Sequence, residues 1–379
     1  MSFSTDIKKN ITLVGCGFLG KYFLTRLLEG YEEYLTRNNI EKESPIVTII
    51  DIAHKSNVYS FPLLDKFQNK NYINYKWSSA GDISKLEEEK VLDNTDAIVY
   101  TAAIADVPFA IRNPNLTYQT NVLNTLQFME FVRKSKFNGK IIGLSSESVY
   151  GHQPYDKLPL KEDEVVTNPS NVYGSSKQAQ EQIFITYAKS YGLNVTALRS
   201  ATMYGPYGRI EQALPIFIRQ VMEEKPVTLD GDGQQSRDFV YVDDTARAIE
   251  LALYTKENIK GQVINIGSGR ETKFLNLIHL IRHTLRLKDV KILNRPFRAG
   301  EEGLRVFLDI TKAEKLLNYS PLIPMNDIDA SGLKTTIEWM ANSILNYDEK
   351  EMDDLRKNMY PLRYPELQDT TKGDIPVSV

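Results

Sequence analysis

The stretch that most constrains the fold of this chain lies near its start. An apolar run, Ile11 to Val14, precedes Gly15-Cys16-Gly17-Phe18-Leu19-Gly20, and an amphipathic run follows to about Leu35. This order predicts a strand, a glycine turn and a helix, with glycines at the G-x-G-x-x-G spacing of a dinucleotide-binding unit. One glycine would make a tight turn, one would let the backbone approach a pyrophosphate, and one would allow close helix–strand packing. The N–H groups at the helix start would face the phosphates.

A second apolar run, Ile46 to Ile50, ends in Asp51. A carboxylate at the end of this strand can accept hydrogen bonds from an adenosine ribose, which favours NAD over NADP. The gap from Gly20 is longer than the usual ~20 residues, and the polar stretch 36–44 has the composition of an insertion. Lys55 leaves NADP open as an alternative, and Asp51 could also simply end a strand.

Further strands and helices are expected at the rhythm of an α/β protein. Strands are predicted at Tyr72–Tyr75, Ala97–Thr101, Lys140–Ser145 and Val195–Arg199, and long helices at about Asn115–Lys136 and Tyr173–Tyr191. Alternating strands and helices predict a Rossmann-like, doubly wound parallel sheet. Ligands of such sheets bind at the carboxyl ends of the strands.

From Gly205 the regular alternation gives way to Pro-containing joints and short elements. We therefore expect a flexible N-terminus over residues 1–10 and an NAD-binding domain over residues 11–204, to which later segments also contribute. A smaller ligand-binding α/β lobe is expected over residues 205–346, followed by a polar tail over residues 347–379.

Composition excludes several classes of function. The net charge of −3 gives no reason to expect binding to nucleic acid or to an acidic membrane surface. The single cysteine, Cys16, rules out an internal disulfide and fits a reducing compartment. The start lacks the apolar core of a signal peptide, and no apolar run approaches the roughly 20 residues of a membrane span. We expect a cytoplasmic protein.

No metal site is expected. The four histidines are His54, His152, His279 and His283. The last two have the i, i+4 spacing of a zinc-binding helix, but no Glu follows His279 and the residues between them read as core.

Tyr173 and Lys177 are separated by four positions and would share one face of a helix. An ammonium beside a phenol is expected to lower the phenol pKa from its usual value of about 10. Such a Tyr can remove a proton from a hydroxyl while a nicotinamide accepts the hydride. Taken alone, the spacing also fits a solvated helix face.

Several more motifs occur in a recognisable order. They are Gly81-Asp82-Ile83, Ala102-Ala103, Asn121-Val122-Leu123-Asn124-Thr125, Ser145-Ser146-Glu147-Ser148-Val149-Tyr150-Gly151, Leu198-Arg199, Tyr204-Gly205-Pro206, Gly231-Asp232-Gly233, Arg237–Asp244, Asn265–Gly269 and Arg298-Ala299-Gly300-Glu301. With the glycine loop and Tyr173–Lys177, they make the chain resemble the extended short-chain dehydrogenase/reductases that act as NAD-dependent nucleotide-sugar epimerases and dehydratases, such as UDP-glucose 4-epimerase. The resemblance runs from about Ile11 to Met340.

The resemblance implies a cofactor site for NAD. The pyrophosphate would be held by Gly15, Gly17, Phe18, Leu19 and Gly20, and the adenosine ribose by Asp51. Asp82 and Ile83 would flank the adenine, Ala102 and Ala103 would line the nicotinamide side, and Lys177 would bind the nicotinamide ribose. Asn121 and Tyr173 would complete this site.

The resemblance also implies catalytic and substrate residues. Tyr173 would act as the base, Lys177 would lower its pKa, and Ser146 would hydrogen-bond the reacting sugar hydroxyl, unless it only satisfies a turn. Thr202, Arg237, Arg298 and Glu301 would contact a nucleotide sugar. The two arginines would clamp the diphosphate and nucleoside, since guanidinium offers a fixed fork of donors.

The choice of reaction depends on the residues after Ser146. Related 4,6-dehydratases have Asp-Glu after the catalytic Thr, whereas this chain has Glu147-Ser148, so an acid is available and the base is missing. Related decarboxylases have Glu at the position of Ser148. A 4-epimerase needs neither, so we expect 4-epimerisation of UDP-glucose/UDP-galactose or the related uronic acid. Glu147 could take part in catalysis, contact the substrate or a loop, or mark a second chemistry.

Alternatives remain at this stage. A 4,6-dehydratase or UDP-glucuronate decarboxylase is the nearest one, and a non-catalytic NAD-binding protein or a simple alcohol or steroid dehydrogenase is more distant. Thr202 stands where many epimerases have Asn, and Asp230 stands where an aromatic residue often packs on the base, so the base is open. The family pairs the helices at Asn115–Lys136 and Tyr173–Tyr191 in a dimer, which makes a homodimer the expected assembly.

Overall fold

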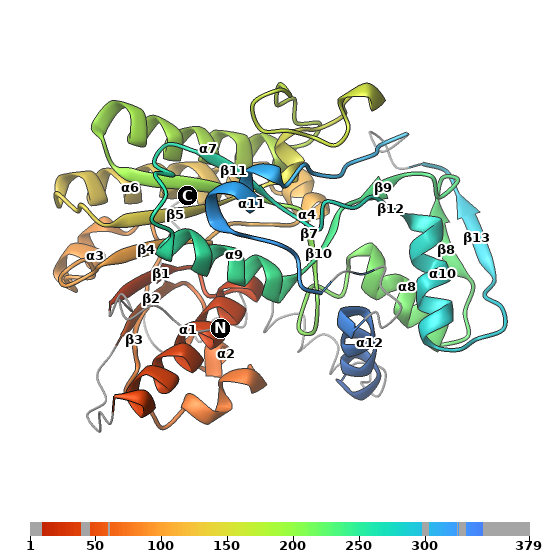
Figure 1. Ribbon diagram of the computed structural model, residues 1–379, viewed down its shortest axis with the longest axis horizontal. Helices are drawn as coiled ribbons and strands as arrows, with labels where there is room; N and C mark the ends of the chain where they lie inside the picture. Colours follow the sequence, from red (N-terminus) through yellow and green to blue (C-terminus); the bar gives the residue numbers. More distant parts are fainter. Residues whose placement is uncertain are drawn as a thin grey trace.

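The computed structural model describes residues 10–38, 46–59, 61–297, 303–323, 325 and 331–343. Figure 1 shows a sheet enclosed by helices and, beside it, a smaller lobe of helices and short strands. Arg298 and Glu301, which were expected to contact the substrate, lie outside the described residues. So do residues 1–9 and the tail 347–379.

The centre of the fold is a seven-stranded parallel sheet. Its strands in spatial order are β11 (Val263–Ile266), β6 (Asn194–Ser200), β5 (Lys140–Ser146), β4 (Ala97–Tyr100), β1 (Ile11–Val14), β2 (Val47–Asp51) and β3 (Ile73–Trp77). The strand order reverses between β1 and β4, which is the point where ligands of doubly wound sheets bind. The predicted fold class is confirmed. The strand that sequence reasoning did not assign is β11, which joins the sheet from beyond residue 204.

Helices cover both faces of the sheet, as the uninterrupted burial of strands such as β1 and β4 requires. On one face α1 (Phe18–Arg37) packs against α9 (Val242–Tyr254), and on the other lie α6 (Asn124–Lys134) and α7 (Val172–Tyr191) (Figure 1). The helix predicted from about Asn115 is divided into α5 (Pro114–Tyr118), a π-helical turn and α6. Helix α7 begins at Val172 because the Asn171 side chain caps it by accepting the Gly174 N–H at 2.9 Å.

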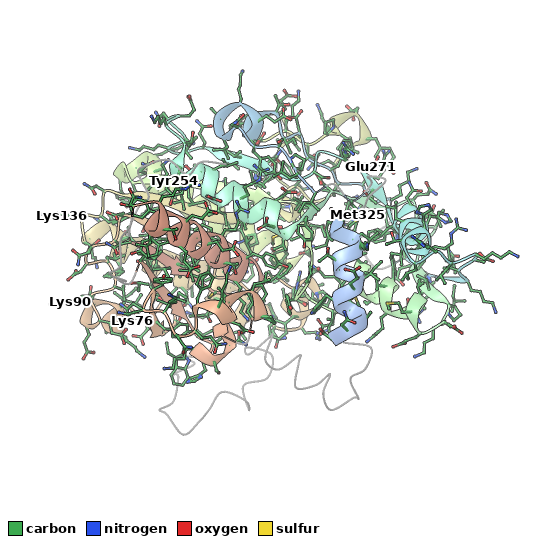
Figure 2. All side chains as sticks on the ribbon, turned by 60° about the horizontal axis from the view of Figure 1, so that its bottom comes forward. Lys76, Lys90, Lys136, Tyr254, Glu271 and Met325 are labelled. Carbon is green, nitrogen blue, oxygen red and sulfur yellow. The ribbon has the colours of Figure 1, made fainter. Side chains whose placement is uncertain are left out.

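The lobe has an apolar core of its own. Its main elements are α8 (Ala213–Met222), α10 (Phe274–Thr284), α12 (Ser331–Ser343) and the parallel pair β8 (Val227–Asp230) and β13 (Ile292–Arg295). In Figure 2, Lys76, Lys90 and Lys136 mark the end of the molecule that holds the sheet, and Glu271 and Met325 mark the end that holds the lobe. A further parallel pair, β7 (Thr202–Tyr204) and β10 (Phe239–Tyr241), links the lobe to the sheet.

None of the helices within the described residues combines the length and apolar character that crossing a membrane requires. In the same part of the chain, no group of three or more His, Cys, Asp or Glu side chains is arranged to hold a metal ion. His279 and His283 both lie on α10.

Candidate active site

The glycine loop between β1 and α1 is shaped by close contacts at Gly15 and Gly20. Gly15 has a φ of +89°, and a Cβ there would lie 2.6 Å from the Ala102 backbone. A Cβ on Gly20 would lie 2.5 Å from the Gly15 carbonyl oxygen. These two glycines therefore make the tight turn and the close helix–strand packing that the spacing predicted.

Gly17 differs from these two glycines. Its φ is −76°, which any residue can adopt, and a Cβ there would meet no heavy atom within 4 Å. The fold of the described chain thus does not need a glycine at this position. Open space beside the start of α1 fits a site where a pyrophosphate approaches the backbone. These residues fit the NAD site that the sequence predicted.

Gly17→Ala should separate ligand binding from folding. We expect this variant to unfold at nearly the wild-type temperature and to lose NAD affinity by at least about tenfold, because the added methyl occupies the pyrophosphate space. Gly20→Ala is the matched comparison, since its methyl meets the Gly15 carbonyl and should lower the melting temperature. Thermal unfolding and NAD titration of both variants test this. Normal NAD binding by Gly17→Ala would contradict the assignment.

Asp51, at the end of β2, lies against the glycine loop. Its carboxylate accepts the N–H of Cys16 and, at 2.7 Å, the N–H of Ala53. Burial raises the Asp51 pKa, and these backbone donors and the Lys21 charge oppose the shift. Because β1 and β2 are paired in the sheet, the longer chain between Gly20 and Asp51 does not displace the carboxylate.

Of the other predicted cofactor residues, two follow strand β4 and one caps a helix. Ala102 and Ala103 follow β4, and Ala102 lies against Gly15. Asp82 caps α3 (Ile83–Glu88) by accepting the Lys85 N–H at 3.3 Å, so part of its role is structural.

Asn121 is fully buried and holds the segment after β4 against α7. Its amide oxygen accepts the Ile104 N–H at 2.7 Å, and its amide nitrogen donates to the Ile104 carbonyl at 3.0 Å and to the Ser176 hydroxyl at 2.9 Å. These contacts give Asn121 a positioning role in the described structure.

The structure brings Ser146 and Tyr173 together. Ser146 ends β5, Tyr173 lies in the first turn of α7, and the Ser146 hydroxyl lies close enough to the Tyr173 phenol to lower its pKa. The Ser146 hydroxyl also accepts the Ser148 N–H at 3.2 Å. Lys177 lies one turn further along α7, is 2% exposed, and donates to the Leu144 carbonyl at 2.7 Å and to Gln180.

The pKa of Tyr173 is raised, and the predicted lowering is wrong for this structure. Burial of the phenol is the largest cause, and the nearby Ser146 hydroxyl and the charge of Arg209 oppose it. Burial also lowers the Lys177 pKa to about 7, with Glu181 opposing. Desolvation of the two buried groups therefore outweighs the lowering of the Tyr173 pKa that was expected from the neighbouring Lys177 ammonium.

Arg209 is a site residue that sequence reasoning missed. It lies shortly after Tyr204-Gly205-Pro206, and its guanidinium is 3.4 Å from the Asp106 carboxylate. Asp106 caps α4 (Val107–Arg112), which follows the nicotinamide-side alanines. The motif Tyr204-Gly205-Pro206 just before it was the available signal, but nothing in the local sequence indicated that the Arg209 charge acts on Tyr173.

A buried ion pair supports the helix face behind Lys177. Glu181 is fully buried and receives two hydrogen bonds from the Arg199 guanidinium, at 2.8 and 2.7 Å. The Ser145 hydroxyl donates to the same carboxylate at 2.6 Å, and Arg199 lies 4.7 Å from the centre of the Tyr150 ring. The pair ties α7 to β5 and β6 one turn beyond Lys177.

Glu147 lies in the same site, where it is hydrogen-bonded to Thr202. One carboxyl oxygen of Glu147 is hydrogen-bonded to the Thr202 hydroxyl at 2.5 Å, and the other is buried with no partner in the described structure. Burial is the main reason that the Glu147 pKa rises to about 8, with Asp238 adding to the rise and Thr202 and Arg237 opposing it. The Glu147 charge in turn raises the Tyr173 pKa, so the two groups share one site.

Arg237 lies on the lobe side of this site. It ends the short strand β9 (Ser236–Arg237), donates to the Ser236 carbonyl at 2.9 Å, and lies 5.6 Å from the centre of the Phe274 ring. The charge of Arg237 reaches Glu147. The structure thus brings together Ser146, Glu147, Tyr173, Thr202 and Arg237 from segments far apart in sequence.

Known proteins share this architecture. Residues 11–267 match the model of the NAD dependent epimerase/dehydratase family. UDP-glucuronate 4-epimerase of Thermodesulfobacterium geofontis is 30% identical over 85% of this chain and 97% of that protein. dTDP-glucose 4,6-dehydratase of Salmonella typhimurium is 25% identical over 87% of this chain and 92% of that protein. The crystal structure of UDP-glucuronic acid 4-epimerase from Bacillus cereus, in complex with UDP-glucuronic acid and NAD, aligns with a TM-score of 0.74 and 26% identity, covering 88% and 99% of the two chains.

Proposed function

Because the chain belongs to the NAD dependent epimerase/dehydratase family, we propose that it is a 4-epimerase of a UDP-hexose or of the related uronic acid. It is an enzyme, and its cofactor is NAD. The observation that carries the proposal is that Ser146, at the end of β5, and Tyr173, on α7, lie in one site with Glu147, while Ser148 carries no carboxylate.

The residues of this chain can carry the proton transfers that such a reaction needs. Tyr173 takes the proton of the C4 hydroxyl, and Ser146 hydrogen-bonds the same oxygen and holds it at the phenol. NAD held by the glycine loop and Asp51 would supply the acceptor for the C4 hydride and the donor for its return. Tyr173 then gives the proton back. Arg237 offers its guanidinium to the diphosphate of the substrate.

The side chains that directly follow Ser146 favour epimerisation over elimination. A 4,6-dehydratase needs both an acid and a base beside the catalytic hydroxyl residue. Glu147 is one such group, whereas Ser148 is a hydroxyl residue and cannot act as a second carboxylate. One of the similar proteins is a 4,6-dehydratase, so dehydration is the second candidate.

Product analysis tests the proposal. The purified protein is incubated with UDP-glucose, UDP-galactose, UDP-glucuronate or dTDP-glucose, with and without added NAD, and the products are identified by NMR. We expect a 4-epimer of at least one UDP-sugar and no net formation of NADH. A 4-keto-6-deoxy product or released carbon dioxide would contradict the proposal.

We also propose a cytoplasmic homodimer that pairs the α5–α6 segment and α7. Apolar side chains on this side of the sheet are partly exposed: Tyr118 by 37%, Leu123 by 47% and Leu126 by 39%. Burying them against a second copy removes apolar surface from water. Light scattering that gives the mass of a single chain would contradict the dimer.

A further inference from the structure

We propose that Glu147, in its ionised form, makes this site select sugars with uncharged groups next to the reacting carbon and discriminate against uronic acids. This inference rests on the proposed function and favours a neutral UDP-hexose as the substrate when Glu147 is ionised. Two similar proteins are 4-epimerases of UDP-glucuronate, so this chain would differ from them in substrate.

The position of Glu147 places its carboxyl near the reacting carbon. Glu147 follows Ser146 directly, in the short 3-10 turn Glu147–Val149. The Glu147 charge raises the Tyr173 pKa. Ser146 and Tyr173 are the groups that would contact the C4 hydroxyl. The carbons on either side of C4 are C3, which carries a hydroxyl, and C5, which carries a hydroxymethyl group in hexoses and a carboxylate in uronic acids. We expect these substituents to come closest to Glu147, because Glu147 directly follows Ser146.

Glu147 has unused hydrogen-bonding capacity. The side chain is 7% exposed, and Thr202 engages only one of its two oxygens. The second oxygen is buried without a partner in the part of the chain that the structure describes. A buried oxygen without a partner costs free energy, and a substrate hydroxyl that bonds to it removes that cost. The carboxylate of a uronic acid cannot donate such a bond.

The charges around Glu147 also oppose a third carboxylate. Asp238, next to Arg237 in the chain, already raises the Glu147 pKa, and Arg237 is the cation that counters it. Asp238 is fully buried and fixed by Ser268, whose N–H and hydroxyl donate to it at 2.8 and 2.5 Å, so it cannot turn away. The Thr202 hydroxyl is hydrogen-bonded to Glu147, and the Glu147 charge acts on the Tyr173 phenol. Like charges brought together in a buried site repel strongly.

The preference for a neutral hexose over a uronic acid should depend on pH. Burial raises the Glu147 pKa to about 8, so Glu147 is mostly protonated at pH 6.5 and mostly ionised at pH 9. A protonated carboxyl can donate to a uronate, whereas an ionised one repels it. Uronate binding should therefore weaken as the pH rises through about 8. Binding of a neutral hexose does not add this like-charge repulsion.

Equilibrium binding of UDP-glucose and UDP-glucuronate provides the test. It is measured by calorimetry with NAD-loaded Tyr173→Phe protein, which should bind without turnover. At pH 9 we expect UDP-glucose to bind at least about tenfold more tightly than UDP-glucuronate. Adding Glu147→Gln, which keeps an oxygen for Thr202 and removes the charge, should shift the preference toward UDP-glucuronate by about tenfold and abolish its pH dependence.

The outcomes separate this inference from the proposed function. Equal affinity for the two nucleotides at pH 9, or a preference that Glu147→Gln leaves unchanged, would overturn the role of Glu147. A binding preference combined with no 4-epimer in the product assay would sink the proposed reaction and leave the inference standing. If Tyr173→Phe folds poorly, the ratio of kcat/KM for the two sugars in the Tyr173 protein is the second measurement, with the same expected dependence on pH and on Glu147→Gln.

Discussion

Replacing Tyr173 by Phe should lower kcat roughly 10²- to 10⁴-fold, the range that proton transfer by a positioned side chain contributes. Phe keeps the ring and its packing but cannot accept the proton of the C4 hydroxyl. NAD binding and the melting temperature should change little, because the loss is one hydroxyl at a half-buried position. The measurements are turnover of UDP-glucose, the NAD content of the protein, and thermal unfolding.

Tyr191→Phe is the matched control for this experiment. Tyr191 lies at the other end of the same helix and is 53% exposed. It should retain wild-type turnover, since it lies at the opposite end of α7 from Tyr173. If Tyr173→Phe and Tyr191→Phe were equally active, Tyr173 would not be the base.

Removing Glu181 should cause a large loss of stability. In Glu181→Leu the Arg199 guanidinium stays buried, with an exposed fraction of 5% and no carboxylate to pair with. Breaking such a pair from one side costs about 3–5 kcal/mol of unfolding free energy. Denaturant unfolding measures the cost.

Two further variants make the Glu181 experiment specific. The double variant Glu181→Leu/Arg199→Met should recover much of the lost stability, because no charge is then left buried alone. Glu33→Ala breaks the exposed pair of Glu33 and Arg37 and should cost less than about 1 kcal/mol. A cost for Glu181→Leu as small as that for Glu33→Ala would show that the Glu181–Arg199 pair does not hold α7 to the sheet.

Local sequence patterns predicted most of the sheet and its helices. The strand before Gly15, helix α1 after it, and helix α7 all follow from residue patterns over short stretches of chain. These signals are local, so they survive in a single sequence. Strand β11 was missed because a run of four residues, Val263–Ile266, has no local feature that assigns it to a sheet edge.

The site residues also divide into those that the local sequence indicates and those that only contacts between distant segments bring together. The sequence by itself determined the dinucleotide loop, the position of Asp51 after β2, and the Tyr173–Lys177 spacing, because each depends on neighbours within one element or one turn. Only the tertiary structure decided that Glu147 binds Thr202, 55 residues away, and that the Arg209 charge acts on Tyr173. It also decided the direction of the Tyr173 pKa, because desolvation depends on every segment that packs around the phenol, and no short stretch of sequence contains those segments.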